Sequence, residues 1–271
     1  SADRIGSLMP SLADLINASN NDLPVTMKHE RWLLDGSKVT KKAAKTAQQI
    51  LSGELGSSRT REPLFRASSM GYCHRRQVFA RIASKAGLVK REPQDGKLAN
   101  IFLTGNFLHL KWQVAGLSAG YMSEVEVPVD RPEIGYGGTM DARLFDGSGF
   151  EYKSINSRGY SMVTDRRQPT NQHLHQVHAY MLLAGVDEFS VVYEDKDKQE
   201  WKEFRVKKDI QVEDSVRSEM RALTDSYLQK RLPEVLPDCA KKVGNEYYNC
   251  PFRDVCLKIK EWPKDVNGDY A

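Results

Sequence analysis

The feature that most constrains this chain is a pair of short charged motifs, Gly138-Thr-Met-Asp141 and Glu151-Tyr-Lys153. Turn-forming residues at 146–149 separate them, so the motifs are predicted to occupy adjacent strands at about 136–145 and 150–155. The Glu and the Lys of the second motif then share one face of the sheet. Carboxylates gathered at one place repel each other unless a cation lies between them, which favours a divalent metal. Taken alone, the pattern is also typical of solvated ion pairs on a surface hairpin.

Apolar periodicity places further elements around this hairpin. A strand is predicted at 122–129, where Val125, Val127 and Val129 fall on one side and acidic residues on the other. The remaining predicted elements are helices at 100–117, 171–184 and 211–229 and strands at 188–193 and 200–206. This succession of helices and strands predicts an α/β fold.

Two of the predicted helices carry pairs of polar or small residues four positions apart, and each pair therefore shares a face. Gly105 and His109 form the first pair, and a glycine within a helix often marks close packing that brings neighbours together. The simpler interpretation of His109 is a core histidine bonded to a carbonyl. Gln176 and Tyr180 form the second pair, for which the simpler interpretation is a half-buried tyrosine beside a solvent-facing glutamine.

Taken together, these motifs resemble a known family. The set Gly105-x-x-x-His109, Gly138-x-x-Asp141, Glu151-x-Lys153 and Gln176-x-x-x-Tyr180 is similar, in this order, to the RecB-type branch of the PD-(D/E)xK nuclease superfamily. The resemblance covers about 68–256. It implies a restriction-endonuclease-like mixed sheet flanked by helices, and a metal-dependent exonuclease that hydrolyses DNA phosphodiester bonds.

The resemblance also implies roles for individual residues. Mg²⁺ or Mn²⁺ would be bound by His109, Asp141, Glu151 and the backbone carbonyl of Tyr152, because hard cations prefer oxygen ligands. Lys153 would orient the attacking water and stabilise the developing charge. Gln176 and Tyr180 would brace the site and contact the DNA strand, completing a catalytic set of Asp141, Glu151, Lys153, Gln176 and Tyr180.

Four cysteines provide an independent observation, since Cys73 precedes this region and Cys239, Cys250 and Cys256 follow it. From the residues alone they are compatible with unrelated buried thiols, a zinc site or, in a secreted protein, disulfides. One early and three late cysteines resemble the iron-sulfur subgroup of the same nucleases, which includes CRISPR-associated and helicase-associated enzymes. That resemblance implies a structural [4Fe-4S] cluster joining the two ends of the nuclease domain, with Zn²⁺ as the alternative.

Basic residues near these motifs are the candidates for DNA contact. Arg75 and Arg76 flank the first cysteine, and a loop predicted at 154–170 has a solvated surface as its equally weighted alternative. The candidates in that loop are Arg158, Tyr160, Arg166 and Arg167. His173, His175 and His178 crowd one predicted helix, and we expect them to face solvent or DNA instead of a metal.

Composition and length set wider limits. The 271 residues carry 40 basic and 36 acidic side chains, a net charge of +4 that is no nucleic-acid signature by itself. The sequence has no apolar run long enough for a membrane span and no apparent signal peptide, so a cytoplasmic, possibly phage-encoded protein is expected. The predicted organisation is a helical extension at 1–66, a nuclease domain at 67–260 and a tail at 261–271.

The N-terminal extension is predicted to contain an amphipathic helix marked by Leu8, Leu12, Leu15 and Ile16, a second helix with a basic face at 39–51, and a linker at 53–61. The expected binding partner is DNA, either single-stranded or at duplex ends. The sequence is also compatible with an oligomer and with a partner protein from recombination, a phage or a CRISPR system. Two other functions stay open: a non-catalytic iron-sulfur subunit that binds DNA or assists assembly, and a zinc module with coincidental motifs.

Overall fold

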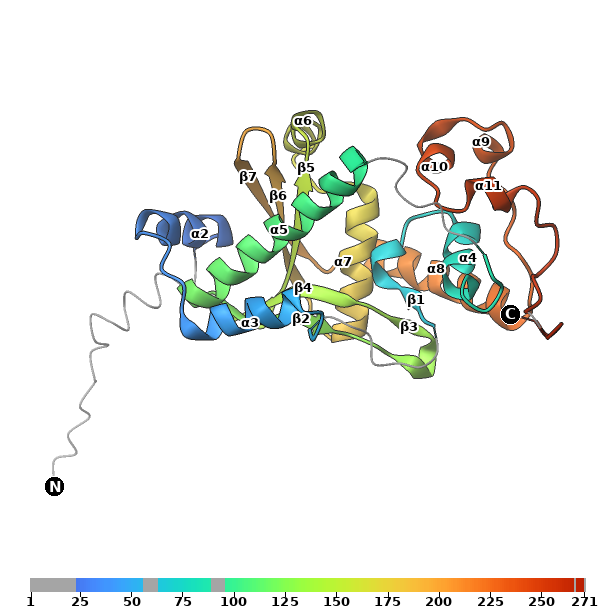
Figure 1. Cartoon of the computed structure of the whole chain (residues 1–271), viewed down its shortest axis with the longest axis horizontal. Coiled ribbons are helices and arrows are strands. Elements are labelled where there is room, and N and C mark those ends of the chain that lie inside the picture. Colours follow the sequence, from blue (N-terminus) through green and yellow to red (C-terminus); the bar gives the residue numbers. More distant parts are fainter. Residues whose placement is uncertain (1–22, 56–62, 89–95, 266, 271) are drawn as a thin grey trace, which may run out of the picture.

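The computed structural model describes residues 23–55, 63–88, 96–265 and 267–270 (Figure 1). The predicted amphipathic helix at Leu8–Ile16 and most of the predicted linker at 53–61 lie outside these residues. Within the described residues, no helix is both long and apolar enough to cross a membrane.

A five-stranded mixed sheet forms the centre of the molecule, with the order β2-β4-β5-β6-β7. Its strands are β2 (Met122–Pro128), β4 (Thr139–Leu144), β5 (Gly149–Ile155), β6 (Glu188–Asp195) and β7 (Glu200–Lys207). The β5 and β6 strands are parallel, whereas the other neighbours are antiparallel. Two short parallel strands, β1 (Phe65–Arg66) and β3 (Tyr136–Gly137), form a separate small sheet. The predicted mixed sheet flanked by helices is confirmed.

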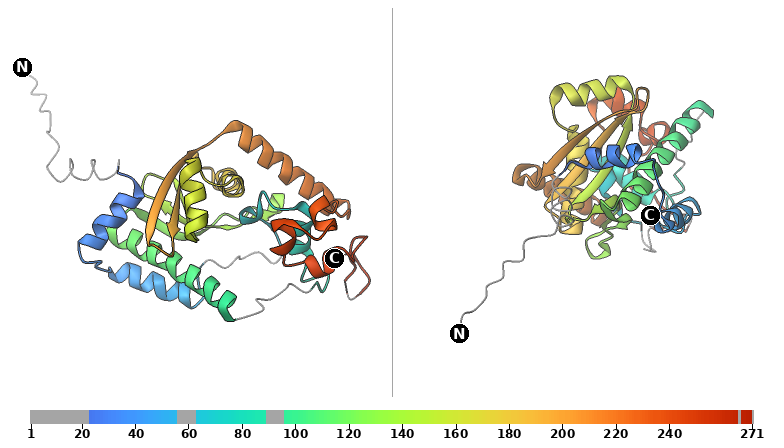
Figure 2. Two further views of the ribbon diagram at one scale, coloured as in Figure 1. Left: turned by 90° about the horizontal axis from the view of Figure 1, so that it is seen from above. Right: turned by 90° about the vertical axis from the view of Figure 1, so that its left-hand side faces the viewer.

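Helices cover both faces of the central sheet. The longer ones are α2 (Val25–Leu34), α3 (Lys41–Leu51), α4 (His74–Ile82), α5 (Gly96–Ala119), α6 (Ser157–Arg166), α7 (Asn171–Ala184) and α8 (Ile210–Leu228). Seen from above, the sheet lies between α5 with α3 on one side and α8 on the other (Figure 2). The core is accordingly divided into two clusters, one around Trp112, Phe150 and Tyr152 and the other around Val191 and Tyr193.

The ends of α7 are fixed by residues with well-understood capping roles. Thr170 precedes the helix, and its hydroxyl oxygen accepts a hydrogen bond from the His173 backbone N–H at 3.3 Å. Gly185 ends the helix with a φ of 67°, a left-handed conformation that glycine adopts without strain. These caps explain why the predicted helix at 171–184 is confirmed at both ends.

Most of the other predicted elements are confirmed with small shifts at their ends, but two are not. The predicted strand at 136–145 is interrupted at Gly138, which separates β3 from β4. The predicted loop at 154–170 is wrong, because most of it forms the helix α6. The Asn156 side chain accepts the Gly159 backbone N–H at 2.8 Å and caps this helix, a signal that the surrounding serine, glycine and charged residues obscured.

The glycines of α5 also differ from expectation. A Cβ placed on Gly105 would lie 3.6 Å from the Ser154 hydroxyl, an ordinary van der Waals separation, so close packing does not require glycine there. At Gly116 an added Cβ would overlap the Met122 side chain. The close approach of α5 to the sheet therefore occurs at Gly116, about two turns beyond His109.

The apolar residues in the N-terminal half of α5 were predicted to form a buried face, but several of them are exposed. Phe102, Leu103 and Phe107 are each more than half exposed, at 57%, 52% and 53%. Trp112, by contrast, is fully buried and stacks on His29 of α2 with ring centroids 3.8 Å apart. The C-terminal half of α5 therefore contacts α2 through this ring pair.

The C-terminal residues form a small lobe that packs on α4 (Figure 1). Its short helices are α9 (Pro237–Ala240), α10 (Gly244–Tyr248) and α11 (Arg253–Cys256). The guanidinium of Arg75, which is 5% exposed, donates hydrogen bonds to the carbonyls of Pro233, Cys256 and Ile259. These bonds join the beginning of the predicted nuclease domain to its end.

Candidate active site

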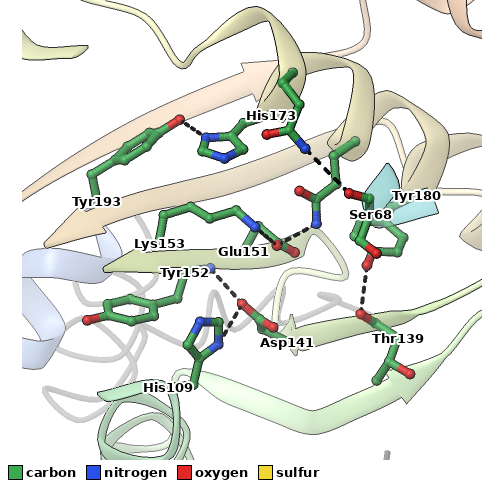
Figure 3. A network of polar contacts seen from close by, with 12 residues as sticks. Ser68, His109, Thr139, Asp141, Glu151, Tyr152, Lys153, His173, Tyr180 and Tyr193 are labelled. Atoms are coloured by element: carbon green, nitrogen blue, oxygen red, sulfur yellow. Dashed lines mark hydrogen bonds and ion pairs between the residues drawn. The ribbon is translucent and has the colours of Figure 1, made fainter. Parts of the chain in front are cut away.

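The candidate site forms where β4 and β5 separate. These strands pair only at Ala142–Phe150 and Arg143–Gly149, so the backbone ladder does not continue past that point. Instead, the Asp141 carboxylate accepts the Tyr152 backbone N–H through Oδ2 at 2.7 Å (Figure 3). In an extended strand the N–H and C=O of one residue point to the same edge, so the Tyr152 carbonyl also faces this opening.

His109 reaches the opening from α5. Its Nδ1 lies 3.3 Å from Asp141 Oδ2, and its ring meets the Tyr152 ring edge-on with centroids 4.8 Å apart. Glu151 and Lys153 come instead from the sheet face covered by α7. The opening between the strands therefore lets side chains from both faces of the sheet meet (Figure 3).

Glu151 is held in an asymmetric way. Its Oε1 accepts hydrogen bonds from Lys153 Nζ at 2.6 Å and from Gln176 Nε2 at 2.7 Å. Its Oε2 is buried and has no hydrogen-bond partner among the described residues. A buried carboxylate oxygen is costly when it is left unpaired, so this atom is suited to accept a further partner such as a cation.

The charges of the site are strongly coupled. Burial raises the pKa of Glu151 to about 7, and the Asp141 charge adds to that increase despite the nearby Lys153. Burial would raise the pKa of Asp141 as well, but His109, Lys153 and the Tyr152 N–H outweigh it and lower the pKa. Burial would lower the pKa of Lys153, whereas the two carboxylates raise it and keep the ammonium charged.

His109 follows the same electrostatic logic. Burial alone would lower the pKa of His109, but the Asp141 carboxylate outweighs it and raises that pKa. A divalent ion would replace the imidazolium as the positive charge beside Asp141, and His109 would then bind the ion as a neutral imidazole.

The donor set of His109, Asp141, Glu151 and the Tyr152 carbonyl suits a hard divalent cation. The unpaired Glu151 oxygen is consistent with such an ion. In the part of the chain that the structure describes, however, no three His, Cys, Asp or Glu side chains are arranged as a ready metal site.

Two polar residues that the sequence analysis missed complete the surroundings of Asp141. The Gln113 amide donates to Glu126 Oε1 at 2.7 Å and to the Asp141 carbonyl at 3.1 Å. Gln113 follows His109 by one helical turn, and this spacing was a usable signal. The side chain of Glu126 was expected on the polar side of the strand, opposite the valines. An irregularity in β2 near Met122 and a φ of 50° at Glu126 interrupt the alternation and turn this side chain toward Gln113. Burial, with a smaller contribution from Asp141, raises the Glu126 pKa.

Gln176 and Tyr180 are both 2% exposed, which excludes the simpler interpretation of a solvent-facing glutamine. The Tyr180 hydroxyl donates to the Thr139 carbonyl at 2.9 Å and thereby holds the start of β4 (Figure 3). A Cβ on Gly138 would lie 3.0 Å from the Tyr180 ring. The glycine of the Gly138-x-x-Asp141 motif thus leaves room for this tyrosine.

The candidate DNA-binding residues have different surroundings. Arg75 is committed to backbone carbonyls inside the protein, so its guanidinium is not available to a phosphate. Arg76 lies over the Tyr72 ring, 4.1 Å from its centroid. On and just after α6, three arginines are exposed and one tyrosine is half-buried against the core: Arg158, Arg166, Arg167 and Tyr160.

The three histidines of α7 were expected to face solvent or DNA, and for His178 this is wrong. His178 is 1% exposed, with Nδ1 bonded to the Leu174 carbonyl and Nε2 accepting the Asp209 backbone N–H. His175 Nδ1 lies 3.4 Å from a Glu219 oxygen, and His173 Nδ1 lies 2.5 Å from the Tyr193 hydroxyl. Their side chains are half-buried and fix α7 to its neighbours.

The four cysteines come from two distant parts of the sequence, and among the described residues they are not arranged as a metal site. All are half-buried and none forms a disulfide. Burial raises the pKa of Cys239 to about 11, and Cys73, Cys250 and Cys256 each add to that increase through their own charge. Burial likewise raises the pKa of Cys73 and of Cys250. Burial of this kind makes a thiol less reactive than a free cysteine.

Comparisons with known proteins give a fold but no family. No protein-family model and no curated protein sequence matches the chain. Among solved structures, that of SSO0001 is 19% identical, with a TM-score of 0.50, and the match covers 80% of this chain and 95% of SSO0001. At this level the likeness concerns the fold alone.

Two structures of LHK-Exo also match, at lower TM-scores. The complex of LHK-Exo with dAMP is 16% identical with a TM-score of 0.48, covering 61% of this chain and 90% of that one. The alkaline exonuclease LHK-Exo from Laribacter hongkongensis is 15% identical with a TM-score of 0.44, covering 67% and 94%.

Proposed function

We propose that this protein is a metal-dependent nuclease that hydrolyses phosphodiester bonds in DNA, and that it acts as an exonuclease. The observation that carries the proposal is the combination at Glu151 of a buried, unpaired Oε2 with an Oε1 held by Lys153 and Gln176. A carboxylate arranged in this way presents one oxygen to a cation while its other oxygen is fixed in place. The resemblance of the motifs to RecB-type nucleases supports DNA as the substrate.

In this proposal, His109, Asp141, Glu151 and the Tyr152 carbonyl hold one or two Mg²⁺ or Mn²⁺ ions. When bound, the metal supplies a water of lowered pKa and neutralises charge on the scissile phosphate. The Lys153 ammonium, fixed by Glu151 Oε1, orients that water and stabilises negative charge as it develops. Gln176 and Tyr180 keep Glu151 and β4 in position.

The test is digestion of single- and double-stranded DNA labelled at either end, with Mn²⁺, Mg²⁺ or EDTA. The comparison is between the wild type and Lys153→Ala, with Lys207→Ala on the exposed edge strand as a matched loss of one lysine. We expect metal-dependent shortening that Lys153→Ala abolishes and Lys207→Ala retains. Absence of cleavage with every metal, by a folded protein that binds DNA, would instead favour the non-catalytic DNA-binding subunit.

We further propose that Cys73, Cys239, Cys250 and Cys256 bind a structural [4Fe-4S] cluster. The resemblance to the iron-sulfur nucleases supports this proposal, and the charges of the other three cysteines act on the Cys239 thiol. Four thiolates also complete the ligand set of Zn²⁺, so metal analysis after anaerobic purification distinguishes the two. Four irons per chain with a brown colour support the cluster, and one zinc in a colourless protein contradicts it.

A further inference from the structure

A small cavity lies beside the candidate site, between α6 and α7. We call it the α6–α7 pocket; its volume is about 100 Å³, and its walls include Ile155, Val163, Met162 and Tyr193. Pockets that bind whole small molecules are roughly 300–1,000 Å³, so this one accommodates a single ring and not a complete nucleotide.

The pocket is continuous with the catalytic strand. Glu151, Lys153 and Ile155 alternate along β5 and so share one face, and Ile155 lies about 6.6 Å beyond Lys153 at the usual rise per residue. Tyr193 of β6 is directly paired with Lys153. A nucleotide attached to a phosphate at Glu151 and Lys153 therefore reaches the pocket without leaving this face.

The position of the pocket in the fold also favours a ligand. It lies where β5 ends at Ile155, next to the end of β6, and these two strands are the parallel pair of the central sheet. In α/β sheets, ligands bind preferentially beyond the carboxyl ends of parallel strands. Figure 3 shows Tyr193 and His173 on the same side as the Lys153 side chain.

The chemistry of the lining matches a nucleobase better than a phosphate. The walls are mostly apolar, and the polar groups, which include Arg166, Gln168 and His173, can bond the edge of a ring. Of the described residues that line the pocket, none carries a carboxylate. Burial and the Lys153 charge lower the pKa of His173 to about 3, so this imidazole is neutral and adds no charge for a phosphate.

We propose that the α6–α7 pocket binds the base of the nucleotide next to the scissile phosphate. The base lies against the aliphatic walls that Ile155 and Met162 provide, while Arg166 and Gln168 contact its edge or the adjoining backbone. This inference rests on the proposed nuclease function. It would make DNA cleavage depend on the presence of a base at one particular position, whatever the identity of that base.

The test combines two substrates with one pocket-filling variant. Gly159 lines the pocket, has room for a Cβ at 3.4 Å from its nearest neighbour, and tolerates a side chain because it lies in α6. The variants are Gly159→Leu, which fills the pocket, and Ser161→Leu, which adds the same side chain at an exposed position of α6. The substrates are end-labelled strands that carry one abasic residue at successive positions, and the matching intact strands.

For the wild type we expect an abasic residue at one position to slow single-turnover cleavage about tenfold, in line with the stacking contribution of one base. Gly159→Leu should cleave the intact strand about tenfold more slowly and should no longer distinguish it from the abasic strand, whereas Ser161→Leu behaves as the wild type. Equal wild-type rates for intact and abasic strands at every position, or equal slowing of both strands by Gly159→Leu, would overturn the proposal.

A binding measurement separates this proposal from the nuclease proposal. With Ca²⁺ in place of Mg²⁺, 2-aminopurine at the sensitive position should change its fluorescence on binding the wild type but not Gly159→Leu. That result supports the pocket even if no metal promotes cleavage, and an unchanged signal with the wild type contradicts it. If Gly159→Leu fails to fold, Met162→Ala, which truncates a wall residue that is 48% exposed, should likewise reduce the discrimination.

Discussion

The side-chain amide of Gln176 lies 2.7 Å from Oε1 of Glu151, the same oxygen that Lys153 contacts. Because both donors use one oxygen, the other oxygen of this buried carboxylate keeps its lone pairs for another partner. Gln176 on α7 thus fixes the orientation of the Glu151 carboxylate on β5, although the two residues are far apart in the sequence.

Replacing Gln176 with alanine should lower kcat by about ten- to a hundredfold and leave KM for DNA nearly unchanged, since Glu151 would lose one of two donors that fix its orientation. Single-turnover kinetics at saturating DNA would measure this. Gln172→Ala, one turn earlier on α7, serves as the control and should retain the wild-type rate. Equal losses in both variants would indicate damage to the helix and not a positioning role.

Asp141→Asn and Asp141→Ala should differ in a predictable way. The Asn side chain keeps an oxygen for the Tyr152 N–H but loses the charge, so we expect metal affinity to fall at least tenfold with little loss of stability. The Ala variant should lose metal binding and also about 1–2 kcal/mol of unfolding free energy, because a backbone donor is left unpaired. Mn²⁺ titration calorimetry and urea unfolding would measure the two effects.

Alanine substitutions of the neighbouring residues Arg75 and Arg76 should have different effects. Arg75→Ala should destabilise the protein by about 3 kcal/mol, since three backbone carbonyls would lose a charged donor inside the protein. Arg76→Ala should change stability by less than about 1 kcal/mol and should instead weaken DNA binding, with the salt-dependence slope reduced by about one. Thermal unfolding and fluorescence anisotropy at several salt concentrations would test this; stronger destabilisation by Arg76→Ala would reverse the assignment.

Because His29 resists protonation in the folded protein, the free energy of unfolding should fall in mild acid. Burial, together with the Lys111 charge, lowers its pKa to about 4 in the folded protein, compared with 6.5 in the unfolded chain. The unfolded chain therefore takes up the proton first, and unfolding free energy should fall as pH decreases from 6.5 to 4. The limiting loss is about 3 kcal/mol.

The matched variant for this prediction is His29→Phe, which keeps a ring against Trp112 but cannot titrate. It gives up the bond between His29 and the Tyr121 hydroxyl, so its stability at pH 7 should be lower, but its decline toward pH 4 should be shallower. Urea unfolding at half-unit pH steps would measure both curves. Parallel curves for the two proteins would show that His29 is not the titrating group.

Local sequence was sufficient for most of the secondary structure. The existence and approximate bounds of β2, α5 and α7 depend on residues within one or two turns of each other, so they can be read without the fold. The loop predicted at 154–170 was wrong because a single capping residue, Asn156, outweighed the turn-like composition that follows it.

By itself, the sequence determined which side chains could take part in the site, since strand and helix periods place Glu151 with Lys153, and Gln176 with Tyr180, on common faces. Only the tertiary structure decided how these faces meet. The separation of β4 from β5 lets His109 reach Asp141 across the sheet, and the irregularity of β2 turns Glu126 inward. The packing of α7 on the same sheet leaves Glu151 Oε2 unpaired. The tertiary structure also places the Arg75 guanidinium inside the protein, where it bonds backbone carbonyls. These outcomes depend on contacts between residues distant along the chain, and local propensity carries no information about them.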